Sequence, residues 1–365
     1  MLPYPATKKL FGGVALGDNH LAVCGDDVQP VILGDTSSTG PVQLQGHRDY
    51  VNCVSAMQLG SSQFTLLSGS ADATVRLWSM DVRDGVSFRC VRTYSGHRGP
   101  VRSCCFLDTS GERFASAGGH DDHTVRLWSS KGAVTSRIVS LLGRRGGVLQ
   151  GHTAPVEHLC TLGDALLASA SLDETVRLWD VRAQRGNAVL RGHRREALCL
   201  AAHYPLLLSS SDDRTIRAWD VRNGAVAFVL TGAHSSSIYA VEFVPQAPWL
   251  CVSGGADGQL AAYDIRTATA AVTAPTAGES PGGRGRRPLY IRRGAHGIRA
   301  LNKIIAASPP LSLGGAEAAP LWTVGDDGCV RGWRCGAAGF EDATPLNGEA
   351  HALLERRNRR VPHDT

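Results

Sequence analysis

Hydrophobic and polar residues alternate over short runs along most of the chain, and the pattern is clearest in residues 151–182. There the runs VEHLCTL, ALLASAS and TVRLW follow one another, separated by Gly, Asp and Ser. Short runs rich in Val, Leu, Thr and aromatic residues, bounded by such turn residues, predict strands. The stretch has no long helical pattern, so each copy of it predicts three or four short strands.

Fixed polar markers show that this stretch is one of several copies. A Gly-His pair opens it at Gly151 and His152, and Asp173 lies six residues before Trp179. Five other copies keep the six-residue spacing: Asp72 and Trp78, Asp122 and Trp128, Asp213 and Trp219, Asp257 and Tyr263, and Asp327 and Trp333. Gly-His pairs precede three of these copies, and Ala-His pairs precede the last two. A repeat at a fixed period decides the fold.

The copies divide the chain into units that form one body. We expect a single domain over residues 1–350, with units at about 8–45, 46–95, 96–150, 151–191, 192–232, 233–294 and 295–350. The first unit is degenerate: Asp27 lies six residues before Leu33, and the Gly-His pair is missing. Counting it gives seven units. The alternative is six units, with residues 1–45 as an N-terminal extension.

Segments rich in Gly, Pro and Arg interrupt this pattern. We expect flexible insertions near 273–290 and 306–320, an exposed loop at 143–147, and a basic C-terminal tail at 351–365. Low-complexity segments of this kind bury too little apolar surface to order themselves.

The net charge and the cysteines indicate what kind of partner and which cellular compartment to expect. The net charge of +5 over 365 residues is too weak to indicate nucleic-acid binding by itself. Ten cysteines form no Cys-x-x-Cys pair, and four of them lie inside the first apolar run of a unit: Cys53, Cys104, Cys160 and Cys199. We expect these to be buried thiols in a reducing compartment. The N-terminal residues lack a secretory signal and no segment resembles a membrane span, so we expect a soluble cytoplasmic or nuclear protein.

The repeated motif resembles that of WD-repeat β-propellers, through GH and SASLDETVRLWD (151–180) and their copies. The resemblance covers residues 46–335 well, 8–45 weakly and 336–365 not at all. It implies an all-β, seven-bladed WD-repeat propeller with a degenerate first blade, or a six-bladed one. It also implies that a strand borrowed from the other terminus closes the ring. Radial repetition of four-stranded sheets leaves few exposed edges, which suits the short strands.

The recurring His, Ser and Asp residues could form a hydrolytic triad. Recurrence favours a structural role instead, because an enzyme needs one active site and this set returns in several units. The expected network contains His47, Asp72, Trp78, His97, Asp122, Trp128, His152, Asp173, Trp179, His193, Asp213 and Trp219. Alternation places Ser169 and Ser171 on the same face, so the sequence leaves open which of them joins the network.

No cofactor, metal or catalytic residue is expected. The histidines fall in separate units, without the close ligand spacing of zinc sites. The glycine tracts at 69–71 and 282–286 are not followed by the Lys-Ser/Thr and helix of a phosphate-binding loop.

The residues that follow the Trp differ from unit to unit. Trp-Asp-x-Arg ends at Arg182 and Arg222, and Tyr263-Asp264-Ile265-Arg266 is a near match. Residues 167–182 and 207–222 resemble the docking box of WD-repeat substrate receptors, which bind the damaged-DNA-binding adaptor of a cullin–RING ubiquitin ligase. An arginine fork on a rim can pair with carboxylates or carbonyls of a partner. The alternative is that these are ordinary solvated side chains.

Charge adds two smaller indications. Arg48, Arg98, Arg194 and Arg195 follow the Gly-His turns and would lie on the opposite rim, where they could receive an acidic peptide. The basic runs at 284–288 and 356–360 could address the nucleus or touch RNA.

Together these features predict a non-enzymatic scaffold whose partners are other proteins, monomeric within a hetero-complex, with no membrane and no direct nucleic-acid contact. The sharper hypothesis is a substrate receptor that docks to the adaptor through Arg182, Arg222 and Arg266. The alternative is a constitutive subunit of a multiprotein or ribonucleoprotein complex in ribosome biogenesis, RNA processing or trafficking.

Overall fold

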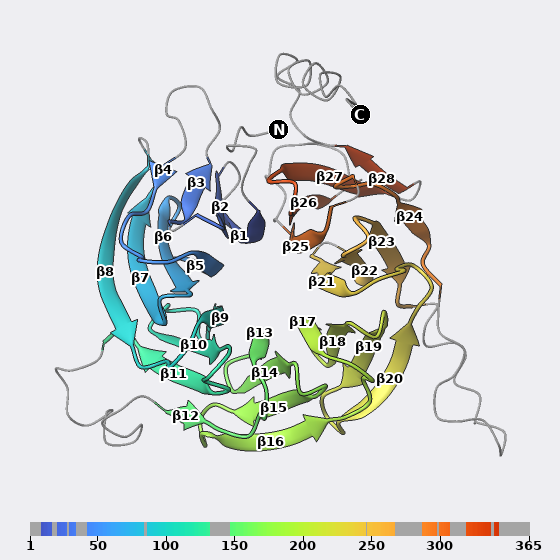
Figure 1. Ribbon diagram of the computed structural model, residues 1–365, viewed down its shortest axis with the longest axis horizontal. Coiled ribbons are helices and arrows are strands. Elements are labelled where there is room, and N and C mark those ends of the chain that lie inside the picture. Colours follow the sequence, from blue (N-terminus) through green and yellow to red (C-terminus); the bar gives the residue numbers. More distant parts are fainter. Residues whose placement is uncertain are drawn as a thin grey trace, which may run out of the picture.

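A computed structural model of the 365-residue chain describes residues 9–16, 20–27, 29–33, 42–83, 86–131, 147–245, 247–266, 287–297, 299–306, 319–336 and 339–342. These residues form seven antiparallel four-stranded sheets, which we call blades 1 to 7 in chain order. The blades stand around a central axis, with their first strands innermost (Figure 1).

The first three blades cover the N-terminal part of the chain. Blade 1 contains β1 (Leu10–Leu16), β2 (His20–Gly25), β3 (Val31–Leu33) and β4 (Val42–Gln43). Blade 2 contains β5 (Val51–Gln58), β6 (Gln63–Ser70), β7 (Thr74–Asp81) and β8 (Ser87–Ser95). Blade 3 contains β9 (Val101–Phe106), β10 (Arg113–Gly118), β11 (Val125–Ser129) and β12 (Val148–Leu149).

The other four blades repeat the arrangement. Blade 4 contains β13 (Val156–Leu162), β14 (Leu166–Ser171), β15 (Val176–Asp180) and β16 (Arg185–Leu190). Blade 5 contains β17 (Ala197–His203), β18 (Leu206–Ser211), β19 (Ile216–Asp220) and β20 (Ala225–Leu230). Blade 6 contains β21 (Ile238–Val244), β22 (Ala247–Gly255), β23 (Leu260–Asp264) and β24 (Tyr290–Arg292). Blade 7 contains β25 (Leu301–Ala306), β26 (Ala319–Gly325), β27 (Val330–Gly336) and β28 (Gly339–Asp342).

The seven-bladed prediction is confirmed, and the degenerate segment at the N-terminus forms a blade of its own. The expected exchange of a strand between the termini is wrong for the described residues. Each of their sheets consists of four consecutive strands, and β1 pairs with β2 of its own blade. The ring is closed instead by contacts between the inner strands β1 and β25.

Side chains hold this closing interface. The amide of Asn302 donates to the carbonyl oxygen of Leu10 at 2.7 Å, and the Lys9 ammonium lies 3.5 Å from the Asp326 carboxylate. Asn52 makes the same kind of bond between blades 2 and 3, to the carbonyl of Val101 at 2.9 Å. The interface of blades 7 and 1 is therefore held by the same kind of hydrogen bond as the interface of blades 2 and 3.

Every inner strand carries the same irregularity. In all seven, the register with the second strand shifts between the first and third residue. Such a bulge bends a strand and re-aims its side chains. The third residues of the seven strands are Gly12, Cys53, Ser103, His158, Cys199, Ala240 and Lys303, and all of them except Ala240 line the central channel.

The apolar core is divided among the seven interfaces between neighbouring blades. In blades 2 to 7 the repeated aromatic residue packs against the preceding blade: Trp179 contacts the blade 3 cluster and Trp219 the blade 4 cluster. Burying a side chain of this size contributes about 3 kcal/mol or more, so the interfaces account for much of the stability.

Several predicted features lie outside the described residues. They are the tail at 351–365 and most of the segments at 143–147, 273–290 and 306–320. In the ranges that are described, no helix has the length and apolar character needed to cross a bilayer.

Candidate functional site

The polar residues of blade 4 meet in one continuous chain of hydrogen bonds. Trp179 donates from its indole Nε1 to the Ser169 hydroxyl at 2.8 Å, and that hydroxyl lies 2.7 Å from His152 Nε2. His152 Nδ1 lies 2.7 Å from the Asp173 carboxylate. With the Ser169 hydroxyl donating to Nε2 and Nδ1–H donating to Asp173, every polar group in the chain is satisfied.

The same chain of bonds occurs in other blades. His-to-Asp distances are 2.6 to 3.0 Å in blades 2 to 7. The hydroxyl is supplied by Ser68, Ser116, Ser169, Ser209, Ser253 and, in blade 7, Thr323. The structure thus brings together all twelve residues expected in the network and adds His234, Asp257, His296, Asp327 and Trp333.

The serine that the sequence left open is Ser169. Ser171 has another task, because its hydroxyl donates to the carbonyl of Ala154 and accepts from the Asp173 amide, both at 3.1 Å. Ser169 is 0% exposed, and its oxygen already accepts the Trp179 N–H. A catalytic nucleophile must be accessible to its substrate, and the Ser169 hydroxyl is not. The set therefore resembles a hydrolytic triad only in the order of its hydrogen bonds.

These bonds also set the acidity of the aspartates. Burial opposes ionisation of Asp173, but hydrogen bonds from His152 and Thr175 outweigh it and hold the pKa of this carboxyl well below its usual range. The corresponding carboxyls in the other five blades have lowered pKa values for the same reason: Asp72, Asp122, Asp213, Asp257 and Asp327.

Two further network residues were missed from the sequence. Thr175 donates to Asp173 at 2.5 Å, and Thr74, Thr124 and Thr215 repeat this bond. Gly151 has φ of +155°, and a Cβ there would lie 2.5 Å from Arg177 Nη1. Glycine is therefore needed both for the backbone and for the arginine beneath it. Both signals were visible: Thr recurs two residues after the Asp, and Arg recurs two before the Trp.

The Trp-Asp-x-Arg arginines lie at the other end of the third strand from the His-Asp network. Arg222 and Arg266 form bidentate pairs with Asp220 and Asp264 of their own motifs, with shortest contacts of 2.5 and 2.6 Å. Arg266 also lies over the Trp249 ring, 4.9 Å from its centroid. In the part of the chain that the structure describes, the exposed Arg182 guanidinium has no such carboxylate pair; only its backbone N–H bonds Asp180.

The arginines after the Gly-His turns lie at the network end of the blades. The backbone N–H groups of Arg48, Arg98 and Arg194 donate to the network aspartates at 3.0 to 3.1 Å, which fixes the position of each turn. Their side chains are exposed, whereas Arg195 pairs with Asp212 at 2.6 Å.

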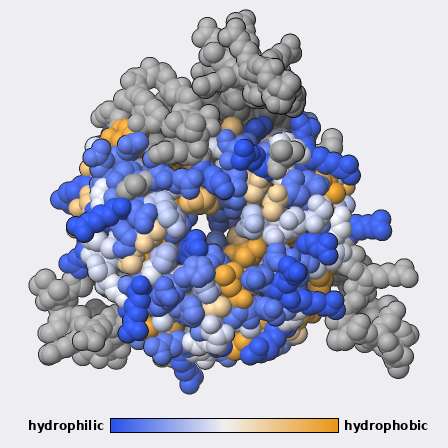
Figure 2. Space-filling model, viewed as in Figure 1, coloured by the Kyte–Doolittle hydropathy of each residue, from blue (hydrophilic) through white to orange (hydrophobic). Residues whose placement is uncertain are grey.

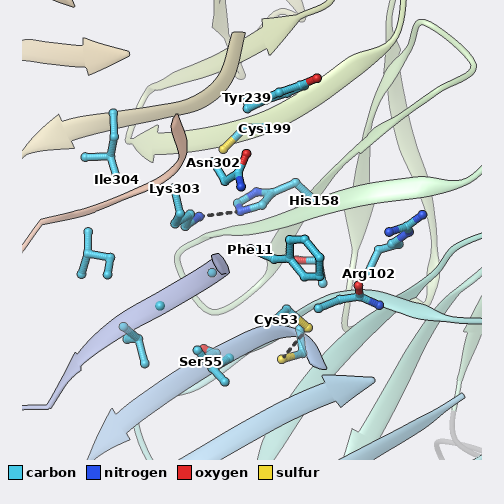
Figure 3. A pocket seen from close by; sticks show the side chains of 18 of the residues that line it. Phe11, Cys53, Ser55, Arg102, His158, Cys199, Tyr239, Asn302, Lys303 and Ile304 are labelled. Atoms are coloured by element: carbon cyan, nitrogen blue, oxygen red, sulfur yellow. Dashed lines mark hydrogen bonds between the residues drawn. The ribbon is translucent and has the colours of Figure 1, made fainter. Parts of the chain in front are cut away.

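A channel of about 1110 Å³ follows the axis of the ring, and the residues that line it were not predicted from the sequence. Figure 2 shows its opening at the centre of a mostly hydrophilic face. Lys303 of blade 7 donates across the channel to His158 Nε2 of blade 4 at 2.9 Å (Figure 3). Burial and the Lys303 charge lower the pKa of His158, which keeps its ring neutral and able to accept this bond.

Other partly or fully buried titratable groups lie near Lys303. Burial raises the pKa of Glu242, and burial likewise raises those of Cys160 and Cys199, so the two thiols stay protonated at neutral pH. Among the described residues, no three His, Cys, Asp or Glu side chains are grouped as metal ligands.

Comparison with known proteins identifies the family. The family model described as "WD domain, G-beta repeat" matches residues 40–79, 88–129, 143–180, 186–220 and 226–264, more than half of the chain. The protein therefore belongs to the WD-repeat family, as the repeated motif predicted.

Two curated relatives are similar over part of the chain. Periodic tryptophan protein 2 of Arabidopsis thaliana is 32% identical over 182 residues, which is 50% of this chain and 18% of the relative. Ribosome biogenesis protein WDR12 homolog of Chlamydomonas reinhardtii is 29% identical over 259 residues, or 64% of this chain and 57% of the relative. The chain thus spans less than two thirds of either relative.

Proposed function

We propose that this propeller is a non-enzymatic scaffold, a constitutive nuclear subunit of a protein or ribonucleoprotein assembly that builds ribosomes. The observation that carries the scaffold role is the sixfold recurrence of one buried polar network, which stabilises blades and offers no single reactive centre. The similarity to a relative named for ribosome biogenesis, over 64% of this chain, supports the kind of assembly.

The two ends of the blades supply separate docking faces. Arg48, Arg98 and Arg194 are exposed at the network end, on turns that the aspartates hold rigid. Arg182, Arg222 and Arg266 are exposed at the opposite end. Because the backbone of each turn is already held in place, a partner can dock on either face without rearrangement of the main chain.

Gradient sedimentation tests the proposal. The tagged chain in extracts of its native cell should co-sediment with a large particle and shift to lighter fractions after RNase treatment. A protein that sediments as a free chain in both extracts would show that it is not a resident subunit.

Matched charge reversals identify the face that docks. One variant carries Arg48→Glu, Arg98→Glu and Arg194→Glu, and the other Arg182→Glu, Arg222→Glu and Arg266→Glu. Both change the net charge equally, so only the variant altered on the docking face should leave the particle.

The second candidate function is a substrate receptor of a cullin–RING ubiquitin ligase. Among the described residues, the Arg182 guanidinium has no carboxylate partner, so it is available to bind one on the adaptor, and this favours the function. Arg222 and Arg266, by contrast, are already paired with their own aspartates. A pull-down of the adaptor with wild type and with Arg182→Ala/Arg222→Ala decides the matter. Equal recovery of adaptor, or none from either protein, rules this function out.

A further inference from the structure

Two cysteines of neighbouring blades touch in the wall of the channel. Cys53 is on β5 of blade 2, Cys104 is on β9 of blade 3, and their sulfur atoms lie 3.5 Å apart (Figure 3). Both residues line the channel, but Cys53 is half-buried whereas Cys104 is only 6% exposed. Cys53 is therefore the more accessible of the two thiols to a solute in the channel.

The position of the pair follows from the geometry of the ring. The third residue of one inner strand faces the fourth residue of the next blade, as the Ser103 hydroxyl shows by accepting the Leu159 N–H at 3.0 Å. Cys53 and Cys104 occupy these two positions at the interface of blades 2 and 3. At the other six interfaces the described fourth residues are Gly13, Val54, Leu159, Leu200, Val241 and Ile304. The thiol pair is therefore not part of the repeat.

We propose that Cys53 and Cys104 form a dithiol modification site, which a small disulfide such as glutathione disulfide oxidises to a bond between blades 2 and 3. The Cys53 thiolate attacks one sulfur of the oxidant, which releases one glutathione thiol and leaves a mixed disulfide on Cys53. Cys104 then attacks the Cys53 sulfur and releases the second thiol. Both protons end on the two released glutathione molecules, and the two protein sulfurs supply the electrons.

The environment of the pair predicts its kinetics. The sulfur atoms must close from 3.5 Å to about 2.05 Å, a small side-chain movement within an existing contact. The hydrogen bond with Cys53 and burial raise the pKa of Cys104, so little thiolate is present at neutral pH. Closure should therefore be slow near pH 7 and accelerate as the pH rises.

Oxidation of the reduced chain tests the site. The purified protein is incubated with glutathione disulfide at pH 7 and pH 9, quenched with acid, alkylated and digested without reductant. We expect a cross-linked peptide pair containing Cys53 and Cys104, with a mass about 2 Da below the sum of the two thiol peptides. It should accumulate faster at pH 9.

Three variants control the assignment. Cys53→Ser and Cys104→Ser should each abolish the cross-link, and Cys104→Ser should stop at the mixed disulfide on Cys53. Cys105→Ser, next in sequence and on the same strand, should form the cross-link at the wild-type rate. Melting curves of the reduced proteins verify that each variant is folded.

Protection of the thiols by an arsenical tests the site in the wild-type protein, without any variant that could fail to fold. Phenylarsine oxide bridges two adjacent thiols and should protect Cys53 and Cys104, but not Cys105, from alkylation. A disulfide from Cys53 to another cysteine, or a mixed disulfide that never resolves at pH 9, would overturn the proposal. So would equal alkylation of Cys53 with and without the arsenical.

Discussion

Blades 1 and 4 have the same strand order but hold their turns by different means. In blade 4, His152, Asp173, Ser169 and Trp179 tie the turn to the sheet within one blade. The segment of blade 1 contains no Trp, so it cannot form this set. Its Gln29 side chain donates to the His47 carbonyl at 3.1 Å and accepts the Gly46 N–H at 2.7 Å, so it is fastened to the turn that leads into blade 2.

The two blades also pack differently against the blade before them. Trp179 fills the interface of blades 3 and 4, whereas the slot in blade 1 holds Leu33. The described buried apolar side chains between blades 7 and 1 are aliphatic: Leu10, Leu21, Val23, Ile305, Val324 and Val330. The partly buried Ala15 and Trp322 pack against them. The comparison teaches that the network secures a blade but does not create one, because burial between neighbours suffices to hold blade 1.

Acid should have the largest effect, because it removes the stabilisation that the network gives to blades 2 to 7 and that blade 1 does not have. The six network aspartates have folded pKa values below those of the unfolded chain, so their contribution is present at neutral pH. It is lost as the pH falls below about 4, when the unfolded chain takes up protons first. Circular dichroism at decreasing pH should show cooperative loss of structure there.

Asp173→Asn separates one aspartate from the rest. The variant should melt below wild type at pH 7, with a clearly smaller difference near pH 3, below the pKa of an unfolded aspartate. The exposed Asp164→Asn in the same blade is the control and should match wild type at both values. A difference that stays constant with pH would show that the carboxylate charge is unimportant.

Trp179→Ala should be the most harmful single substitution, with a loss of about 3–5 kcal/mol, because it removes apolar contacts with blade 3 and leaves a cavity. Trp179→Leu recreates the residue found in blade 1 and should lose less. Urea unfolding followed by fluorescence and by circular dichroism measures both. Equal losses for the two variants would mean that the hydrogen bond, not the packing, is what the tryptophan supplies.

Ser169→Ala should cost about 1–3 kcal/mol, since it leaves the buried Trp179 N–H and His152 Nε2 without their shared partner. Ser169→Thr should restore most of the loss, because Thr323 fills this slot in blade 7. Thermal melts compare the two. If the threonine variant is no more stable than the alanine variant, the hydroxyl is not the stabilising group.

Asn302→Ala at the closing interface removes the bond to Leu10 and a second bond from the same amide to the Asp326 carboxylate at 2.8 Å, so it should cost about 1–2 kcal/mol. Asn52→Ala removes the one matching bond between blades 2 and 3 and should cost about 1 kcal/mol. Parallel urea titrations test whether closure is a weak point of the ring. A loss of more than about 3 kcal/mol for Asn302→Ala, beyond what its two bonds explain, would show that it is.

Arg182→Ala should have the smallest effect, within about 0.5 kcal/mol, because the side chain is exposed. Its melting temperature should equal that of wild type even if partner binding is lost. A destabilised variant would reveal a structural role for this arginine and would weaken its use as a docking probe.

The sequence by itself determined the repeat and the twelve network residues of blades 2 to 5, and it predicted seven blades with six as the alternative. It could do so because the bonds of the network are local: His152, Asp173 and Trp179 lie within one repeat and return at one spacing. It also indicated that blade 1 differs, through Leu33 and the missing Gly-His pair. The choice between Ser169 and Ser171 needed coordinates, because both occupy the same face of one strand.

Only the tertiary structure decided what happens between blades. Lys303 and His158 are 145 residues apart, and Cys53 and Cys104 are 51 apart, with no spacing that marks them as neighbours. The absence of strand exchange among the described sheets was likewise not predictable from the sequence. Each depends on ring closure or side-chain direction, which place residues together without regard to their order in the chain.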